Sequence, residues 1–333
     1  MKTSMRMKNL ILSFVVLMTA WAEGETTVFP PEIKTVGVVM PASVLAKERF
    51  DRGVKALEKA GCRVKLAPRL SFEPRASAED RTADFEEMWL DPEVDLVICA
   101  RGGTGCEDVA ARLDWEKLAK RPDQRFIGFS NVTVLLSALM KHGIGRLYTG
   151  PNLGTVGSAR GDTLQWMIAA FTGAPLPATQ LRAIRKGTFA GKSCGGHIGL
   201  VRKCIDSGWF PCASNRVVFL ERNHSTTVEG IRQELMRIAE SGALAGAAGV
   251  VFGDVTPGAE VSKPGNWGEA KSFKDPHDLD AARARLELIK AEFAEKVGCP
   301  VYDGFVYGHI PIMHTVDFDR VARVDEDGVL TWK

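Results

Sequence analysis

Ser130 is the residue of this sequence best placed to act as a nucleophile. A short apolar run, residues 126–129, precedes it, and apolar residues recur at three- and four-residue spacing from Val132 to Met140. The pattern predicts a strand that turns sharply into a helix at Ser130. Such a turn lifts a hydroxyl off the sheet edge, near the positive end of the helix, as in a nucleophile elbow. The alternative is that Ser130 only caps the helix, so the catalytic interpretation needs partners elsewhere.

A serine nucleophile requires a base, and His309 is the candidate among six histidines. It follows a predicted strand, and Gly308 and Pro311 could hold its loop rigid. The alternative is a structural histidine. The other histidines are His142, far along the helix that begins at Ser130, His224 and His277 in polar stretches, His197 after a Gly-Gly pair, and His314.

The third member of a triad is a carboxylate that orients the imidazole. Glu221 ends the apolar run 217–220, where an unpaired buried acid would be costly, so a partner is implied. A salt bridge to Arg222 is the structural alternative, and Asp254, which also follows an apolar run, is the competing acid.

The glycine-rich segment 102–105 follows a predicted strand and precedes a helix. It does not match a dinucleotide-binding fingerprint, because Asp108 stands where a small residue is required and would repel a pyrophosphate. At the carboxyl edge of a parallel sheet, the Gly103 N–H could instead face the same point as Ser130 and bind an oxyanion. A plain tight turn is the alternative.

Strands and helices alternate from Thr35 to Tyr148, which predicts an α/β fold with a doubly wound parallel sheet. A turn-rich stretch follows. Beyond it, strand-like runs and helices of mixed order predict a second, smaller α/β domain that ends in a hairpin between Val321 and Trp332.

Basic residues followed by an apolar run and Ala20-Trp21-Ala22 predict a cleavable signal peptide over residues 1–22, and therefore a periplasmic or secreted protein. Without its three basic side chains, the chain keeps 40 basic against 41 acidic residues. We expect no nucleic-acid partner, no membrane span after signal removal and no cofactor. Cysteine and histidine spacing does not support a metal site, and the seven cysteines are expected to be mostly buried thiols.

In this order, the pieces resemble the LD-carboxypeptidase family of serine peptidases, which trim murein tetrapeptides. The resemblance covers about residues 33–320. It rests on Val-Gly-Val-Val-Met-Pro-Ala-Ser (36–43), Ala-Arg-Gly-Gly-Thr-Gly (100–105), Ile-Gly-Phe-Ser-Asn (127–131), Gly-Pro (150–151), Gly-Gly (195–196), Phe-Leu-Glu (219–221), Gly-Asp (253–254) and Tyr-Gly-His (307–309).

The resemblance implies a catalytic triad of Ser130, His309 and Glu221, and an oxyanion hole from the backbone N–H groups of Gly103 and Asn131. It also implies a homodimer and a flavodoxin-like N-terminal domain followed by a swivelling, barrel-like β/α domain. We expect the domains at residues 33–160, which carry the nucleophile, and 191–333, which carry the acid and the base, with a linker at 161–190.

Four positions depart from the family's usual pattern: Asn131 replaces Asp, Thr104 replaces Tyr, Thr149 replaces His, and Ile310 begins a stretch that is usually glycine-rich. We expect these changes to line the substrate cleft and to alter specificity more than chemistry.

The leading hypothesis is a serine carboxypeptidase that removes D-alanine from an L,D-bond of a murein tetrapeptide. One alternative is a hydrolase of acyl-adenylate or other peptide conjugates, like the related microcin-immunity enzymes. Another is an exported protein that binds muropeptides without cleaving them.

Overall fold

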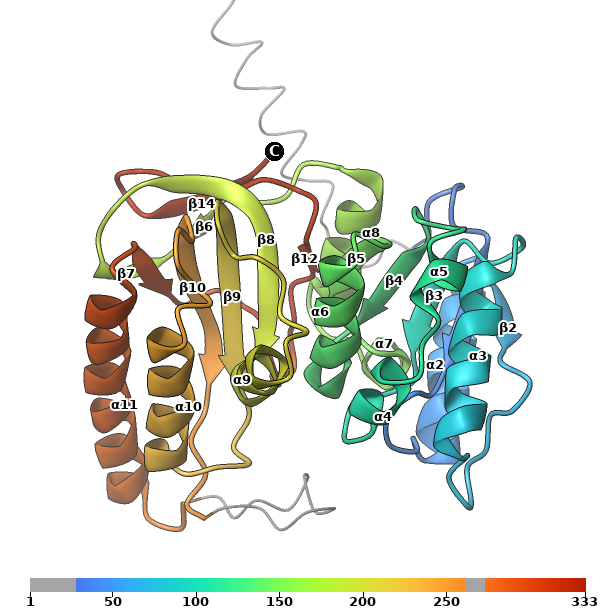
Figure 1. Cartoon of the computed structure of the whole chain (residues 1–333), viewed down its shortest axis with the longest axis horizontal. Coiled ribbons are helices and arrows are strands. Elements are labelled where there is room, and N and C mark those ends of the chain that lie inside the picture. The colour runs from blue at the N-terminus through green and yellow to red at the C-terminus, as the bar shows by residue number, and fades with distance from the viewer. Residues whose placement is uncertain (1–27, 261–272) are drawn as a thin grey trace, which may run out of the picture.

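The computed structural model describes residues 28–260 and 273–333, so the predicted signal peptide lies outside the described residues. The chain forms two α/β halves that lie side by side (Figure 1). In the described part, no helix combines the length and apolar character needed to cross a bilayer.

The N-terminal half is built on a six-stranded sheet of order β12-β5-β4-β3-β1-β2, in which the five strands β1 to β5 are parallel. This is the predicted doubly wound, flavodoxin-like arrangement. The strands are β1 (Thr35–Val39), β2 (Arg63–Leu66), β3 (Leu96–Cys99), β4 (Arg125–Gly128) and β5 (Arg146–Thr149), and the intervening helices are α2 (Lys47–Lys59), α3 (Ala78–Leu90), α4 (Cys106–Ala110), α5 (Trp115–Leu118), η2 (Ser130–Val132) and α6 (Thr133–Lys141).

Helices cover both faces of this sheet. Side chains that alternate along each central strand therefore enter one of two cores. Val36 and Val38 belong to the core that α2 covers together with α7 (Leu153–Val156) and α8 (Thr163–Thr172). Val39 belongs to the other core, which α3 and α6 cover. The carboxyl ends of the strands are left as the open edge where loops can form a site.

The C-terminal half contains an eight-stranded, barrel-like sheet of order β6-β14-β13-β8-β9-β10-β11-β7. Its central strands β8 to β11 are parallel, and helices α9, α10 and α11 cover one side of it (Figure 1). The elements are β6 (Thr179–Gln180), β7 (Arg182–Arg185), β8 (Phe189–His197), α9 (Ile198–Asp206), β9 (Arg216–Arg222), α10 (Val228–Glu240), β10 (Gly249–Val255), α11 (Pro276–Val297), β11 (Val301–Asp303), β13 (Ala322–Val324) and β14 (Val329–Trp332). The expected fold class is confirmed, whereas the exact domain boundaries stay a prediction.

The chain returns to the first half near its end. Strand β12 (Val316–Asp317) pairs antiparallel with β5 at the edge of the N-terminal sheet, beside which Figure 1 shows it. One hydrophobic core contains side chains from both halves, including Leu135 of α6 and Phe219 of β9. The two halves are therefore joined by a strand and by a shared core as well as by the covalent chain.

A buried hydrogen bond crosses the same interface. The hydroxyls of Thr149, at the end of β5, and Tyr307 lie 2.8 Å apart, and both side chains are fully buried. Burial raises the pKa of the Tyr307 phenol, so this residue stays a neutral hydrogen-bonding partner. Tyr307 lies two residues before His309, and the contact therefore fixes the loop that carries the candidate base.

We predict that Tyr307→Phe lowers the free energy of unfolding by about 1–2 kcal/mol, because it leaves the buried Thr149 hydroxyl without a partner. Urea unfolding measures this change. Adding Thr149→Val removes the orphaned hydroxyl and should restore most of the loss. A double variant at least as unstable as the sum of the two single variants would contradict the account.

Candidate active site

Ser130 lies at the sharp turn between β4 and helix η2. Phe129 is extended, whereas Ser130 has φ of 64°, one of two positive values among the described residues other than glycine. The residues at the N-cap positions of η2 and α6 are Phe129 and Val132, and no described N–H donates to the Ser130 side chain. Ser130 therefore does not cap the helix, and its strained backbone is typical of a functional turn.

The glycine-rich segment lies directly against this turn. A Cβ on Gly102 would lie 2.7 Å from Ser130 Cβ and 3.1 Å from the Asn131 nitrogen, so only glycine fits there. Gly103 has φ of 113°, and no described residue accepts a hydrogen bond from its N–H. The loop is held from the segment between β1 and α2, because Ser43 Oγ accepts from the Thr104 N–H at 3.1 Å. These contacts leave the Gly103 N–H able to bind an oxyanion.

Asn131 is buried and its side chain is fixed by two hydrogen bonds. Its Oδ1 accepts from the Cys106 N–H at 2.9 Å, and its Nδ2 donates to Glu107 Oε2 at 3.1 Å. Glu107 also pairs with Lys203 of α9 at 3.4 Å. Burial would raise the pKa of Glu107, but its hydrogen bonds and Lys203 outweigh burial and lower it. An ionised Glu107 therefore holds the residue after the serine in place.

His309 and Glu221 form a close pair. His309 Nδ1 lies 2.7 Å from Glu221 Oε2, and Glu221 is fully buried at the end of β9. Burial pushes the pKa of Glu221 up, but the charge and hydrogen bond of His309 outweigh it, so the pKa lies below its ordinary value. With Nδ1 bound to the carboxylate, Nε2 is the imidazole nitrogen that remains to serve as a base.

The alternatives considered for Glu221 do not fit its contacts. Arg222 pairs instead with Glu234, at 2.8 Å, and Asp254 accepts hydrogen bonds from the Thr256 hydroxyl. Burial raises the pKa of Asp254, and the Thr256 hydrogen bond only partly opposes that rise. Glu221 is therefore the carboxylate that orients His309.

His197 is a further histidine at the site. It follows the Gly-Gly pair at the end of β8, and its ring centroid lies 5.8 Å from that of His309. Its Nε2 lies 3.1 Å from Arg222 Nη1 and 3.3 Å from Asn223 Oδ1, and its buried Nδ1 has no partner among the described residues. Burial and the charge of Arg222 lower the pKa of His197 to about 3, so its imidazole is neutral near pH 7.

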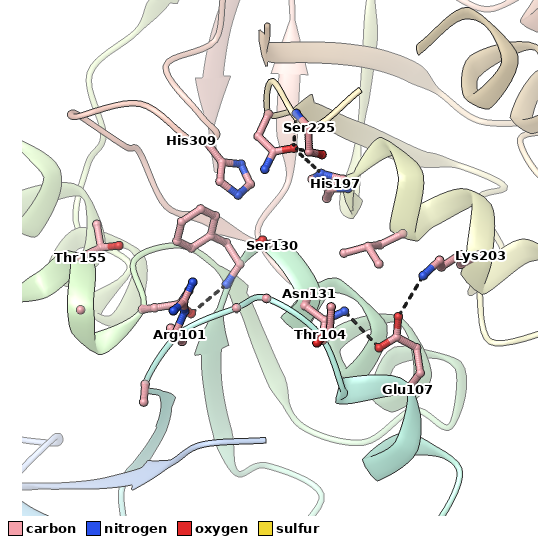
Figure 2. Close-up of a pocket in the computed structure, with 18 of the residues that line it drawn as sticks. Arg101, Thr104, Glu107, Ser130, Asn131, Thr155, His197, Lys203, Ser225 and His309 are labelled. Atoms are coloured by element: carbon pink, nitrogen blue, oxygen red, sulfur yellow. Dashed lines mark hydrogen bonds and ion pairs between the residues drawn. The ribbon is translucent and has the colours of Figure 1, made fainter. Parts of the chain in front are cut away.

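These groups surround one cavity of about 240 Å³ between the two halves (Figure 2). Ser130, Asn131, Gly102 and Gly103 line it from the N-terminal half, and His197, Asn223, Ser225 and His309 from the C-terminal half. No hydrogen bond joins Ser130 to His309 among the described residues, and such bonds often form only in the substrate complex. The structure thus brings Ser130, His309, Gly103 and Asn131 to one cavity, with Glu221 behind His309.

The four departures from the family pattern are distributed differently from our expectation. Thr104 and Asn131 do line the cavity, but Thr149 and Ile310 are not among its described lining residues. The expectation was wrong for Thr149, because its hydroxyl makes the buried hydrogen bond with Tyr307 and does not face the cavity.

The sequence did not predict a role for Arg49, Glu107 or Lys203, which line the cavity, and Ser43 entered only as the last residue of the motif 36–43. These side chains come from helices and loops far apart in the chain, so only the fold brings them together. Arg101 was noticed only as part of the glycine-rich motif, although it also lines the cavity.

The remaining histidines lie elsewhere. His142 stacks on Trp115, and His314 stacks on Trp166 while its Nε2 lies 3.1 Å from Asp162 Oδ1. Within residues 28–260 and 273–333, no group of three or more His, Cys, Asp or Glu side chains is placed to hold a metal ion. Over the same ranges all seven cysteines are free thiols, five of them buried.

A serine on a strained strand-to-helix turn and an imidazole held by a buried carboxylate thus line one cavity of an α/β fold, an arrangement that is typical of hydrolytic enzymes. Comparison with known sequences identifies the family. Residues 36–149 match the LD-carboxypeptidase N-terminal domain, and residues 190–324 match the LD-carboxypeptidase C-terminal domain. The chain belongs to the LD-carboxypeptidase family, a family of peptidases.

Two relatives illustrate the similarity. The "Probable murein peptide carboxypeptidase" of Bacillus subtilis is 27% identical over 288 residues, covering 83% of this chain and 83% of the relative. The "Murein tetrapeptide carboxypeptidase" of Pseudomonas aeruginosa is 31% identical over 132 residues, covering 38% of this chain and 43% of the relative.

Solved structures share the fold. A muramoyltetrapeptide carboxypeptidase from Oxalobacter formigenes superposes with a TM-score of 0.71 at 22% identity, covering 90% of this chain and 98% of its own. An MccF-like protein from Bacillus anthracis gives a TM-score of 0.74 at 16% identity, covering 93% and 99%. At these identities, the likeness establishes the fold alone.

The strained turn generates a stability prediction. Ser130→Gly should be more stable than Ser130→Ala by about 1 kcal/mol, because glycine adopts a positive φ without steric cost. Urea unfolding of both variants measures the difference. Ser137, in helix α6, is the matched control: there glycine should be the less stable replacement by about 1 kcal/mol. The same order of stability at both positions would contradict strain at Ser130.

The neutral His197 generates a pH prediction. Its pKa is about 3 in the folded chain and about 6.5 when unfolded, so the unfolded state takes up the proton first. Its contribution to stability is therefore present above pH 6.5 and is lost as the pH falls towards 3. The variant His197→Gln should lose less unfolding free energy than the wild type between pH 7.5 and pH 4.5. An equal loss in both proteins would show that His197 does not titrate in this way.

Proposed function

We propose that the chain is a serine LD-carboxypeptidase that removes D-alanine from the C-terminus of a murein tetrapeptide. The single observation that carries the proposal is the pair of His309 and Glu221, 2.7 Å apart, on the cavity that Ser130 enters from a strained turn. Relatives named as murein peptide carboxypeptidases support the choice of substrate.

In the proposed reaction, Ser130 Oγ attacks the carbonyl carbon of the scissile L,D-bond while His309 Nε2 accepts the hydroxyl proton. Glu221 stabilises the resulting imidazolium, and the N–H groups of Gly103 and Asn131 bind the oxyanion. The C–N bond then breaks as the imidazolium gives its proton to the amine of D-alanine. A water molecule that loses a proton to His309 attacks the acyl-enzyme, and the proton returns to Ser130 Oγ as the ester breaks.

The location of the substrate agrees with the predicted signal peptide. Murein lies outside the cytoplasmic membrane, so we propose that the enzyme acts in the periplasm or after secretion. The homodimer that the family resemblance implies stays a prediction.

An acyl-adenylate substrate is a weaker fit to the cavity. Part of the chain is 31% identical to the microcin C7 self-immunity protein of Escherichia coli, over 34% of this chain. The described lining contains a single benzene ring, Phe129, and its centroid lies 4.9 Å from that of His309. With one benzene ring in the described lining, the cavity offers no pair of phenyl faces to enclose a nucleobase, so we retain the murein peptide.

We predict that the purified protein releases D-alanine from a murein tetrapeptide and that Ser130→Ala lowers the rate by at least about 10³-fold. Glu221→Gln should lower it by roughly 10²- to 10⁴-fold, because a neutral amide cannot stabilise the imidazolium. Chromatography of the released amino acid measures both rates.

Two controls sharpen this experiment. Ser241→Ala removes a hydroxyl that donates to Ile238 O at the C-terminal end of α10, where neither residue lines the cavity, and it should leave the rate unchanged. The same peptide ending in L-alanine should not be cleaved. Binding of the tetrapeptide without any release of D-alanine by the wild type would instead support a non-catalytic binding protein.

A further inference from the structure

Two arginines at one end of the cavity have no acidic partner within the part of the chain that the structure describes. Arg49, in the first turn of α2, and Arg101, directly after β3, both line the cavity. The guanidinium of Arg101 donates to Val44 O at 3.1 Å, and no described carboxylate pairs with either arginine. Burial, together with the charge of Arg49, lowers the pKa of Arg101, so the partly buried Arg101 is repelled by the exposed Arg49 beside it.

The other cations near the cavity are neutralised. Lys203 pairs with Glu107 at 3.4 Å, and Arg222 pairs with Glu234 at 2.8 Å. In Figure 2, Arg101 lies on one side of Ser130, and the pair of Lys203 and Glu107 lies on the other. Because desolvated charge without a counter-ion is unfavourable, the Arg49 and Arg101 end of the cavity calls for an anion that arrives with a ligand.

The place of Arg101 in the chain, next to the loop that contacts Ser130, indicates the kind of anion. Arg101 immediately precedes Gly102, the residue whose backbone lies against Ser130. In a substrate whose last residue is the leaving group, only the amide nitrogen and one Cα separate the scissile carbonyl from the terminal carboxylate. Standard bond lengths place that carboxylate within roughly 5 Å of the carbonyl carbon. Arg101 lines the same cavity and adjoins the glycine-rich loop, so it is the cation that we expect to meet this carboxylate.

We propose that Arg101, assisted by Arg49, forms the subsite that binds the C-terminal carboxylate of the substrate. The inference rests on the proposed function and deepens it, because the subsite explains why a free C-terminus is required. A guanidinium can bind both carboxylate oxygens through two parallel N–H groups. A peptide that continued past this point would leave the two arginines unpaired, so internal bonds are poor substrates.

The test compares a murein tetrapeptide that ends in free D-alanine with the same peptide ending in D-alaninamide. The wild type should cleave the free acid with a kcat/KM about 10- to 100-fold higher than that of the amide, the range expected for hydrogen bonds between charged groups. Arg101→Met should lower kcat/KM for the acid by a similar factor and leave that for the amide within about threefold. Retained cleavage of the amide shows that the variant is folded.

Two further variants keep the test independent of any misfolding of Arg101→Met. Arg49→Met changes an exposed side chain and should reduce the preference for the acid by a smaller factor of about 3 to 10. Arg52→Met is the matched control, because Arg52 is an exposed arginine of the same helix that does not line the cavity. It should keep the full preference for the acid.

Specific outcomes would overturn the inference. Equal cleavage of acid and amide by the wild type, or an undiminished preference in both Arg101→Met and Arg49→Met, would exclude a carboxylate subsite while leaving the peptidase intact. Failure of the wild type to cleave either peptide would instead overturn the proposed function. Adenosine monophosphate is the probe for a phosphoryl group: competition that Arg101→Met abolishes, without any preference for the acid, would assign the arginines to phosphate.

Discussion

The pairing of one buried carboxylate with one imidazole constrains the whole site. Glu221 is fully buried, and its Oε1 has no hydrogen-bond partner among the described residues, so its charge is compensated mainly through His309. Gly308 makes the approach possible, because a Cβ there would lie 3.1 Å from Glu221 Cβ and 3.2 Å from its Oε2. The carboxylate of Glu221 is therefore placed to stabilise the imidazolium that a general base becomes during the proposed reaction.

The pair of His309 and Glu221 can act only if it remains close to Ser130, which belongs to the other half of the molecule. The loop between β11 and β12 is therefore attached to the N-terminal half at several points. Tyr307 bonds Thr149, the Met313 N–H donates to Thr163 Oγ1 at 3.1 Å, and β12 extends the N-terminal sheet. His309 lies between these attachments, so its position follows from the docking of the two halves and not from its own strand alone.

Much of the fold and part of the site could be predicted from the sequence because they depend on local patterns. The alternation of buried strands and amphipathic helices gave the parallel sheet, and the end of an apolar run located Ser130 and Glu221. Strand β12 could not be predicted, because two residues carry no periodicity and its partner β5 lies about half the chain away. The arrangement of helix ends around the cavity likewise determines the pairing of Glu107 with Lys203 and the position of Arg49. Such juxtapositions follow from tertiary packing, and no spacing in the sequence encodes them.

Asn131, the residue after the serine, shows how such long-range contacts determine which side chain fits at one position. Asn131 both accepts a hydrogen bond, from the Cys106 N–H, and donates one, to Glu107. An aspartate, the residue more usual in the family, could make the first bond but would place a second carboxylate against Glu107. Because Glu107 is tied to Lys203 on the C-terminal half, the amide of Asn131 couples the turn at the proposed nucleophile to the docked position of α9. Asparagine at position 131 therefore suits its hydrogen-bond partners in this chain, although the family usually has aspartate there. The backbone N–H of residue 131 remains available for the proposed oxyanion hole.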